Sequence, residues 1–193
     1  ARLAAMASGG KKVALLTQTY ASPSTNRLVA QFSEKYGNVT HVTYDAISED
    51  AALNAYQAKY GEHALADYDF AKADVIVSFG ADILGDWQGG GFDGGYAKGR
   101  VPANGKMSRH IQFESNMTLS GANADKRVPL TPAQQKVALA QLFARLNGMS
   151  AGGELPEKAA SVIEQAAAAI RAAGRKAVVV SGLQDQDAQA VVL

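Results

Sequence analysis

The chain has 193 residues, which fits one ordinary domain, since domains cluster near ~100–150 residues and rarely exceed ~250. Hydrophobic residues make up 47% of it and charged residues 19%, a balance that excludes an intrinsically disordered protein. Its 19 basic and 18 acidic residues leave a net charge of +1, so we expect no field that attracts nucleic acid or anionic lipid.

Missing residue types and segments exclude several kinds of site. The chain has no cysteine, which excludes disulfides, a thiolate nucleophile and any iron–sulfur cluster or cysteine-bound zinc held by this chain alone. Its histidines, His41, His63 and His110, lack the i, i+4 spacing of a helical metal pair, and we predict no metal site. No apolar run approaches the ~20 residues of a membrane span, and we find no signal peptide.

The two ends of the sequence suggest a larger parent. The chain does not begin with Met, and the segment from Asp185 to Leu193 has the pattern of an amphipathic helix that is still running at the last residue. We therefore expect residues 1–193 to be a single α/β domain that is a fragment of a longer polypeptide.

The first part of the chain predicts strands that alternate with helices. Val13–Thr17 is an apolar run typical of a buried parallel strand. A helix is expected next, with Ser22 as its N-cap and Pro23 at its first position. Val39–Tyr44 then predicts a second strand, and Asp50–Tyr60 predicts a helix with one apolar stripe.

The same alternation continues to the end of the chain. The strands expected here are Val75–Phe79, Ile111–Phe113 and Val178–Ser181, and the helices run from Thr131 to Leu146 and from Pro156 to Ala173. Thr131 and Gln134 have the spacing of a capping box, and Gly174 is a helix stop. Strands separated by helices predict right-handed crossovers and a mostly parallel sheet with helices on both faces.

A glycine-rich stretch, Gly85–Gly99, holds seven glycines and interrupts this pattern. It matches neither G-x-G-x-x-G nor a Walker loop, because the Gly-Lys-Ser/Thr ending is missing. We expect a mobile surface loop or an interaction tip, in which Trp87, Phe92 and Tyr96 supply apolar contacts. Exposed aromatic side chains on such a loop would need a partner to cover them.

The segment Ser78–Asp82 (SFGAD) is the first candidate for ligand binding. In an open parallel sheet, ligands bind beyond the carboxyl ends of the strands. Gly80 would let the backbone turn and approach a ligand closely, and Asp82 could accept a hydrogen bond from a hydroxyl or a guanine edge. The simpler alternative is that Gly80 ends a buried strand and Asp82 caps the next segment, and composition alone favours that alternative.

Other polar residues give weaker signals. Arg109 and His110, just before the strand Ile111–Phe113, could bind phosphate or carboxylate, although hydrogen bonds to loop carbonyls explain them more simply. The carboxylates Asp82, Glu114 and Asp125 could converge, but their spacing does not show it. No Ser–His–Asp arrangement stands out, and we predict no catalytic residue.

Two segments carry a resemblance to a known family. Tyr68–Asp82 (YDFAKADVIVSFGAD) and Lys106–Pro132 (KMSRHIQFESNMTLSGANADKRVPLTP) resemble the molybdopterin-oxidoreductase-like half of the iron–sulfur subunit of alternative complex III, the bacterial quinol:cytochrome c oxidoreductase. The likeness covers nearly the whole chain. Its strand-plus-GAD portion is shared by the wider superfamily of formate dehydrogenase and dimethyl sulfoxide reductase large subunits, so the resemblance implies an α/β domain of that type.

The resemblance also implies which residues would face a cofactor. In the superfamily, a G-x-N/D loop and an Asp-Pro-Arg sequence adjoin a bis-guanine-dinucleotide molybdopterin, and they correspond here to Gly80, Ala81 and Asp82 and to Glu114. The family's Pro-Gly-Thr-Asp turn corresponds to Thr131–Gln134, which has neither the glycine nor the carboxylate that a guanine edge needs. We therefore expect these residues to be a vestigial cofactor site, no cofactor in this chain, and iron–sulfur clusters in a separate portion of the parent.

The function implied is that of a non-catalytic scaffold domain in the iron–sulfur subunit of a quinol:cytochrome c oxidoreductase. Its partners would be the remaining domains of the same polypeptide and other subunits of a membrane-associated respiratory complex, at the periplasmic face of the bacterial inner membrane. Neither nucleic acid nor direct membrane insertion is expected. The alternative is a fragment of an active molybdopterin-guanine-dinucleotide-dependent oxidoreductase large subunit, which would need a basic, glycine-lined crevice around Asp82 and Glu114. A free-standing nucleotide- or sugar-binding protein is a third hypothesis.

Overall fold

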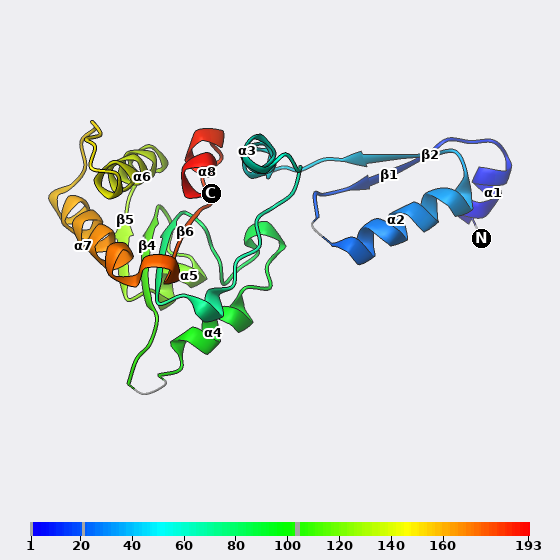
Figure 1. The fold of residues 1–193 in the computed structure, drawn as a ribbon. Helices are drawn as coiled ribbons and strands as arrows, with labels where there is room; N and C mark the ends of the chain where they lie inside the picture. The colour runs from blue at the N-terminus through cyan, green and yellow to red at the C-terminus, as the bar shows by residue number, and fades with distance from the viewer. Residues whose placement is uncertain (1, 21, 103–104) are drawn as a thin grey trace. The chain divides into compact units, whose positions relative to one another are not determined.

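The computed structural model describes residues 2–20, 22–102 and 105–193, and the chain forms two compact units. The first unit is Ala1–Glu49 and the second is Asp50–Leu193. Both appear in Figure 1, where the first is drawn in blue tones and the second in the colours from cyan to red.

The first unit is a short βαβ arrangement. Its elements are α1 (Arg2–Ser8), β1 (Val13–Thr17), α2 (Pro23–Tyr36) and β2 (Val39–Thr43). The strands pair in parallel, and the Ser22 side chain caps α2 by accepting from the amide of Thr25, as the sequence predicts. The expected burial of β1 is wrong, since alternate residues are exposed and Leu16 keeps 65% of its surface. A two-stranded sheet with one crossover helix has a helix for only one of its faces.

The second unit is built on a four-stranded, all-parallel sheet in the order β5-β4-β3-β6. The strands are β3 (Val75–Phe79), β4 (Arg109–Glu114), β5 (Lys126–Pro129) and β6 (Ala177–Ser181). In the central strand, Val77 lies opposite Ile111 on one side and Val179 on the other. All five residues of β3 are buried, as a parallel strand covered on both faces requires. The predicted α/β fold is confirmed.

Six helices of this unit surround the sheet, so the described residues contain eight α-helices in all. They are α3 (Asp50–Tyr60), α4 (Asp93–Arg100), α5 (Leu119–Asn123), α6 (Pro132–Leu146), α7 (Glu157–Ala173) and α8 (Gln186–Val192), with 3-10 turns at Phe70–Lys72, Trp87–Gly89 and Gly174–Lys176. The capping box of Thr131 and Gln134 forms as predicted. Within the described ranges, no helix combines the length and the apolar character needed to cross a bilayer.

Each face of the sheet has its own apolar core. Helices α6, α7 and α8 lie on one face of the sheet (Figure 1). Their apolar side chains pack against the odd-numbered residues of β3 and β4, where Phe79 and Phe113 stack at a centroid distance of 4.8 Å. On the other face, Ile76 and Val180 pack against the segments that precede and follow β3. Because side chains alternate between the two faces along each strand, the same strands contribute residues to two separate apolar cores.

The glycine-rich stretch differs from the prediction, because its aromatic side chains point inward. Trp87 and Tyr96 are buried, and Phe92 packs edge-on against the buried Phe70 at a centroid distance of 5.5 Å. Tyr68 joins this cluster, and its burial raises the pKa of its phenol to about 12. The expectation of exposed aromatic residues on a loop tip is wrong, since they form the second core instead.

Gly182 brings the ends of β6 and β3 together, so its replacement by Ala is expected to lower the free energy of unfolding by about 2–3 kcal/mol. A Cβ at this position would collide with the Gly80 carbonyl and lie 2.9 Å from the Cα of Ala81, and backbone atoms cannot move aside cheaply. Urea unfolding followed by circular dichroism measures the change. The matched control is Gly152→Ala, whose Cβ would enter open space and should alter stability by less than about 0.5 kcal/mol.

Candidate functional site

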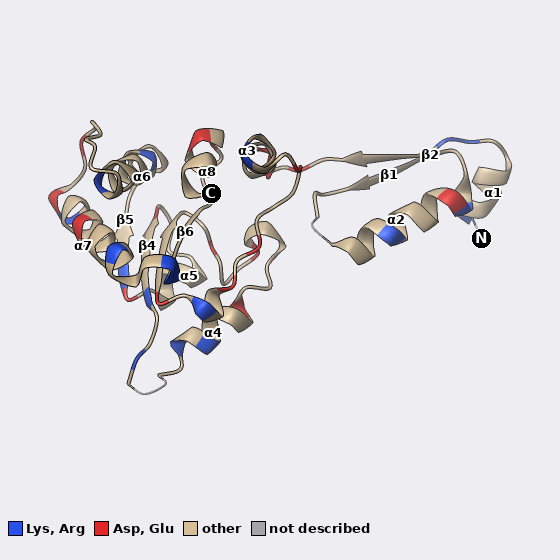
Figure 2. Ribbon diagram, in the orientation of Figure 1, with Lys and Arg blue, Asp and Glu red and all other residues tan. Residues whose placement is uncertain are grey.

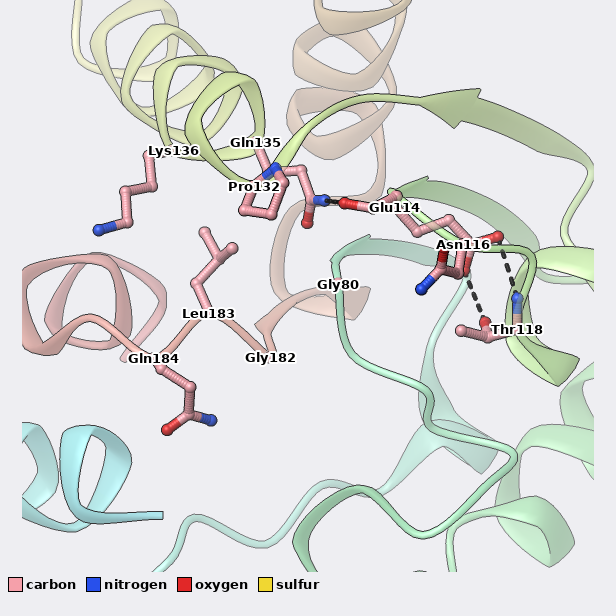
Figure 3. A pocket seen from close by; sticks show the side chains of 11 residues that line it. Gly80, Glu114, Asn116, Thr118, Pro132, Gln135, Lys136, Gly182, Leu183 and Gln184 are labelled. Atoms are coloured by element: carbon pink, nitrogen blue, oxygen red, sulfur yellow. Dashed lines mark hydrogen bonds between the residues drawn. The ribbon is translucent and has the colours of Figure 1, made fainter. Parts of the chain in front are cut away.

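The candidate site lies at the carboxyl end of β3, where the order of strands in the sheet changes direction. Strand β4 lies on one side of β3 and β6 on the other, so the loops after these three strands diverge at the carboxyl end of the sheet. A cavity of about 430 Å³ opens there (Figure 3). Its volume falls within the ~300–1,000 Å³ typical of ligand sites. It is lined by Gly80, Glu114, Ser115, Asn116, Thr118, Pro132, Gln135, Lys136, Gly182, Leu183 and Gln184.

Gly80 turns the chain at the end of β3. Its φ of +73° lies in the left-handed region, and a Cβ would stand 2.7 Å from Oε1 of Gln135. The Gly80 amide donates to the carbonyl of Phe113 at 2.7 Å, which ties the turn to β4. The close approach of backbone to side chain therefore requires glycine at this position.

Glu114 is the last residue of β4, and its carboxylate is held entirely by its own chain. The residue is 1% exposed and forms an ion pair with Nε of Arg127 on β5. Thr118 donates to it through its hydroxyl at 2.6 Å and its amide at 3.3 Å, and Gln112 donates at 3.3 Å. A buried anion needs this much compensation.

Asp82 is engaged in a similar way. Its Oδ1 accepts from the amide of Ser120 at 3.0 Å and from the Ser120 hydroxyl at 2.6 Å, which anchors the start of α5. Ala81 is fully buried, and its carbonyl accepts from the Ser78 hydroxyl and from Gln112. The structure thus brings Ala81, Asp82 and Glu114 together around α5, with their polar groups directed at the protein.

A row of buried polar side chains runs along one face of β4. His110, Gln112 and Glu114 alternate with the apolar residues of the strand, and His110 Nε2 donates to Gln112 Oε1 at 3.1 Å. The hydroxyl of Tyr96 lies 3.1 Å from the other ring nitrogen of His110. Burial lowers the pKa of His110 to about 4, so the imidazole is neutral near pH 7.

Asp125 lies at the opposite end of β4 from Glu114, so the three carboxylates do not converge. It makes a bidentate pair with Arg100 at 2.6 and 2.9 Å and accepts from the amide of His110 at 2.7 Å. Burial alone would raise the pKa of Asp125, but these hydrogen bonds outweigh it and lower the pKa. Arg109 is exposed and reaches Gln165 at 3.5 Å.

The charged groups around the cavity are neutralised in pairs. Lys136 Nζ lies 2.5 Å from Oδ2 of Asp185, the N-cap residue of α8, and this contact lowers the pKa of Asp185. Figure 2 shows basic residues on α6 and acidic residues at α8. With Glu114 paired to Arg127, the cavity presents mostly uncharged groups.

Sequence reasoning missed part of the cavity wall. Gln135, Lys136 and Leu183 line it, but no motif singles them out, because they meet Gly80 only through the packing of α6 and α8. One signal was available: Gln135 is a polar residue on the apolar face of α6, beside Ala138 and Leu139. Elsewhere, no three metal-ligating side chains gather among residues 2–20, 22–102 and 105–193.

Comparison with the models of known protein families and with curated proteins finds no match for this chain.

The buried His110 predicts acid sensitivity. The folded state holds this histidine neutral down to a pKa of about 4, whereas the unfolded chain binds the proton near pH 6.5. The unfolded state therefore carries more protons between these values, and stability should fall by about 3 kcal/mol as pH drops through that window. Urea unfolding at a series of pH values measures the fall.

Two variants assign this effect. His110→Gln should remove the fall between pH 6.5 and 4 whatever its effect on absolute stability, and the exposed His63→Gln should keep it. Equal slopes for the unmodified chain and for His110→Gln would contradict the assignment. The carboxylates Asp125 and Asp185 lose their stabilisation at lower pH, because their folded pKa lies below the ordinary 3.8.

The Glu114–Arg127 pair is expected to matter far more than the surface pairs. Arg127→Leu leaves the Glu114 carboxylate buried without its cation and should lower the free energy of unfolding by about 3–5 kcal/mol. Arg145→Leu removes the partner of Glu164, whose side chain is 63% exposed, and should cost less than about 1 kcal/mol. Urea unfolding of both variants makes the comparison. Similar losses of unfolding free energy would show that the buried Glu114 carboxylate does not depend on Arg127 more than an exposed carboxylate depends on its partner.

Proposed function

We propose that this chain is a non-catalytic scaffold domain in the iron–sulfur subunit of a quinol:cytochrome c oxidoreductase of the alternative complex III type. The proposal includes a fold of the formate dehydrogenase and dimethyl sulfoxide reductase type. Its support is the motif resemblance in Tyr68–Asp82 and Lys106–Pro132 together with the parallel sheet on which both segments lie. The strand-plus-GAD motif coincides with β3 and the turn at Gly80.

One observation favours a scaffold over an enzyme. Asp82 and Glu114, the two carboxylates at the cofactor-facing positions, accept their hydrogen bonds from Ser120, Thr118 and Arg127 of the same chain. The buried Glu114 carboxylate cannot also bind the edge of a guanine without breaking its network of hydrogen bonds, and Oδ1 of the half-buried Asp82 already accepts two hydrogen bonds. The residues present therefore do not fit a molybdopterin dinucleotide, and no catalytic step is assigned to this chain.

A scaffold domain acts by holding its neighbours at fixed positions. The partners in this proposal are the remaining domains of the same polypeptide and other subunits of the respiratory complex, at the periplasmic face of the inner membrane. Iron–sulfur clusters would be carried by the parent outside this chain, since the chain has no cysteine. Nucleic acid has no role in it, and neither does direct insertion into the membrane.

The cavity at the carboxyl end of the sheet favours a second candidate. Its place at the topological switch point and its volume of about 430 Å³ are those of a binding site, as a fragment of an active molybdopterin-dependent oxidoreductase would have. In that case the networks of Asp82 and Glu114 would have to open when the cofactor binds.

Metal and pterin analysis of the full-length parent, purified from its native host, separates the two candidates. The scaffold predicts iron without molybdenum and without a pterin fluorophore. Molybdenum and pterin near one per chain would overturn it. In a parallel measurement, GDP should leave the melting temperature of the 193-residue chain unchanged, whereas a specific site saturated at ~100 times Kd would add about 2.7 kcal/mol of stability.

A further inference from the structure

The second unit carries positive charge along the edge where the strands of its sheet begin. Its basic and acidic residues are nearly balanced as a whole, but several cations gather at this edge. Arg109 is the first residue of β4, Lys126 is the first residue of β5, and Arg175 lies two positions before β6. The register places these strand starts along one edge, because Val75 at the start of β3 lies opposite both Arg109 and Ala177.

Two more cations reach the same edge from α4 and from the segment that follows it. Lys72 lowers the pKa of Asp69 and Lys98 adds to the effect, which places the last turn of α4 beside the turn that precedes β3. The amide of Ser108 donates to a carbonyl of α4 at 2.9 Å, so the segment that holds Lys106 returns to the sheet next to this helix. Figure 2 shows basic residues on α4 and in the segment before β4. We call the following residues the basic rim: Lys98, Lys106, Arg109, Lys126 and Arg175.

The basic rim is not neutralised by its own chain. Among the residues that the structure describes, none of its members forms an ion pair, and the side chain of Arg109 reaches only the neutral Gln165, at 3.5 Å. Carboxylates lie close by, but each is already paired with a different cation: Asp69 with Lys72, Asp74 with Lys176 and Asp125 with Arg100. The positive charge of the rim is therefore available to another molecule.

Exposed apolar side chains lie within the basic rim. Val101 follows α4 directly and is 65% exposed. Met107, between Lys106 and Arg109, is 47% exposed. Protein interfaces combine apolar contacts of this kind with basic side chains, and Arg and Met are enriched in them. The rim therefore offers both charged and apolar contacts to a partner.

The distribution of charge favours an acidic polypeptide over a nucleic acid or a lipid surface. The phosphates of DNA and of an anionic bilayer are closely and regularly spaced, so they would also lie against the carboxylates of Asp69, Asp74 and Asp125. A polypeptide can place Asp and Glu opposite the unpaired cations only, and apolar side chains opposite Val101 and Met107. Such a match of charges favours one partner and disfavours others.

We propose that the basic rim binds an acidic polypeptide segment, whose carboxylates pair with the cations of the rim and whose apolar side chains cover Val101 and Met107. The rim lies at the amino ends of the strands, whereas the cavity lies at their carboxyl ends, so the two surfaces are separate. The inference goes beyond the scaffold proposal and does not depend on it. Because the ion pairs form at an exposed surface, binding should weaken as salt is added.

Binding is measured on the 193-residue chain with a synthetic peptide of Glu and Leu residues, and with a matched peptide in which Gln replaces every Glu. NMR titration of the ¹⁵N-labelled chain with the Glu peptide should shift the backbone amide signals of the basic rim along a curve that saturates. The signals of the cavity residues Asn116 and Gln184 should stay in place. The Gln peptide should bind about tenfold more weakly, and ~0.5 M NaCl should remove the difference.

Two double variants with the same change in net charge locate the binding. Lys98→Gln combined with Lys106→Gln should weaken the binding of the Glu peptide about tenfold, because two surface ion pairs are lost. Lys59→Gln combined with Lys158→Gln, on α3 and at the start of α7, should change it by less than about twofold. All four lysines are exposed, so both variants should retain the fold.

Three results would overturn the inference: equal binding of the two peptides, equal losses in the two double variants, or tighter binding of phosphatidylglycerol vesicles or of a DNA duplex than of the Glu peptide. The last result would make the basic rim a phosphate-binding surface. These outcomes are independent of the metal and pterin analysis. An iron-containing parent whose rim ignores the Glu peptide would refute this inference and leave the scaffold proposal standing.

Discussion

The carboxylate of Glu114 is the constraint around which this end of the second unit is organised. A carboxylate that is 1% exposed must be compensated within the protein, and here Arg127, Thr118 and Gln112 supply the donors. Because these donors come from β5, from the start of α5 and from β4, one buried charge fixes three elements. It also accounts for Gly121, since a Cβ there would occupy the place of the Glu114 carboxylate.

That constraint also bears on the chemistry of the cavity beside it. The turn at Gly80, the start of α6 and the loop after β6 enclose a cavity at the switch point of the sheet. The carboxylates of Asp82 and Glu114 accept hydrogen bonds from Ser120 and Arg127 of the same chain. The other side chains that line the cavity are uncharged except for Lys136, which is paired with Asp185.

Local patterns were enough to find the long elements of the fold. The central strand Val75–Phe79 and the helix capped by Thr131 are predicted by apolar periodicity and capping. Strand β5 was missed because it opens with Lys126 and Arg127, and a buried salt bridge makes a charged residue acceptable there. The Gly80 turn was predictable from its motif, whereas the role of Gln135 depends on α6 packing beside Gly80, about which adjacent residues carry no information.

The central position of β3 means that the sheet cannot be completed until a distant part of the chain pairs with it. One edge of β3 pairs with β4, but the other pairs with β6, about a hundred positions later in the chain. Pairing over such a separation carries a large loop-closure cost, and it slows folding relative to a protein with local contacts. Until β6 has been synthesised, the apolar strand β3 has an open edge, and an open edge of this kind is exposed to pairing with another chain.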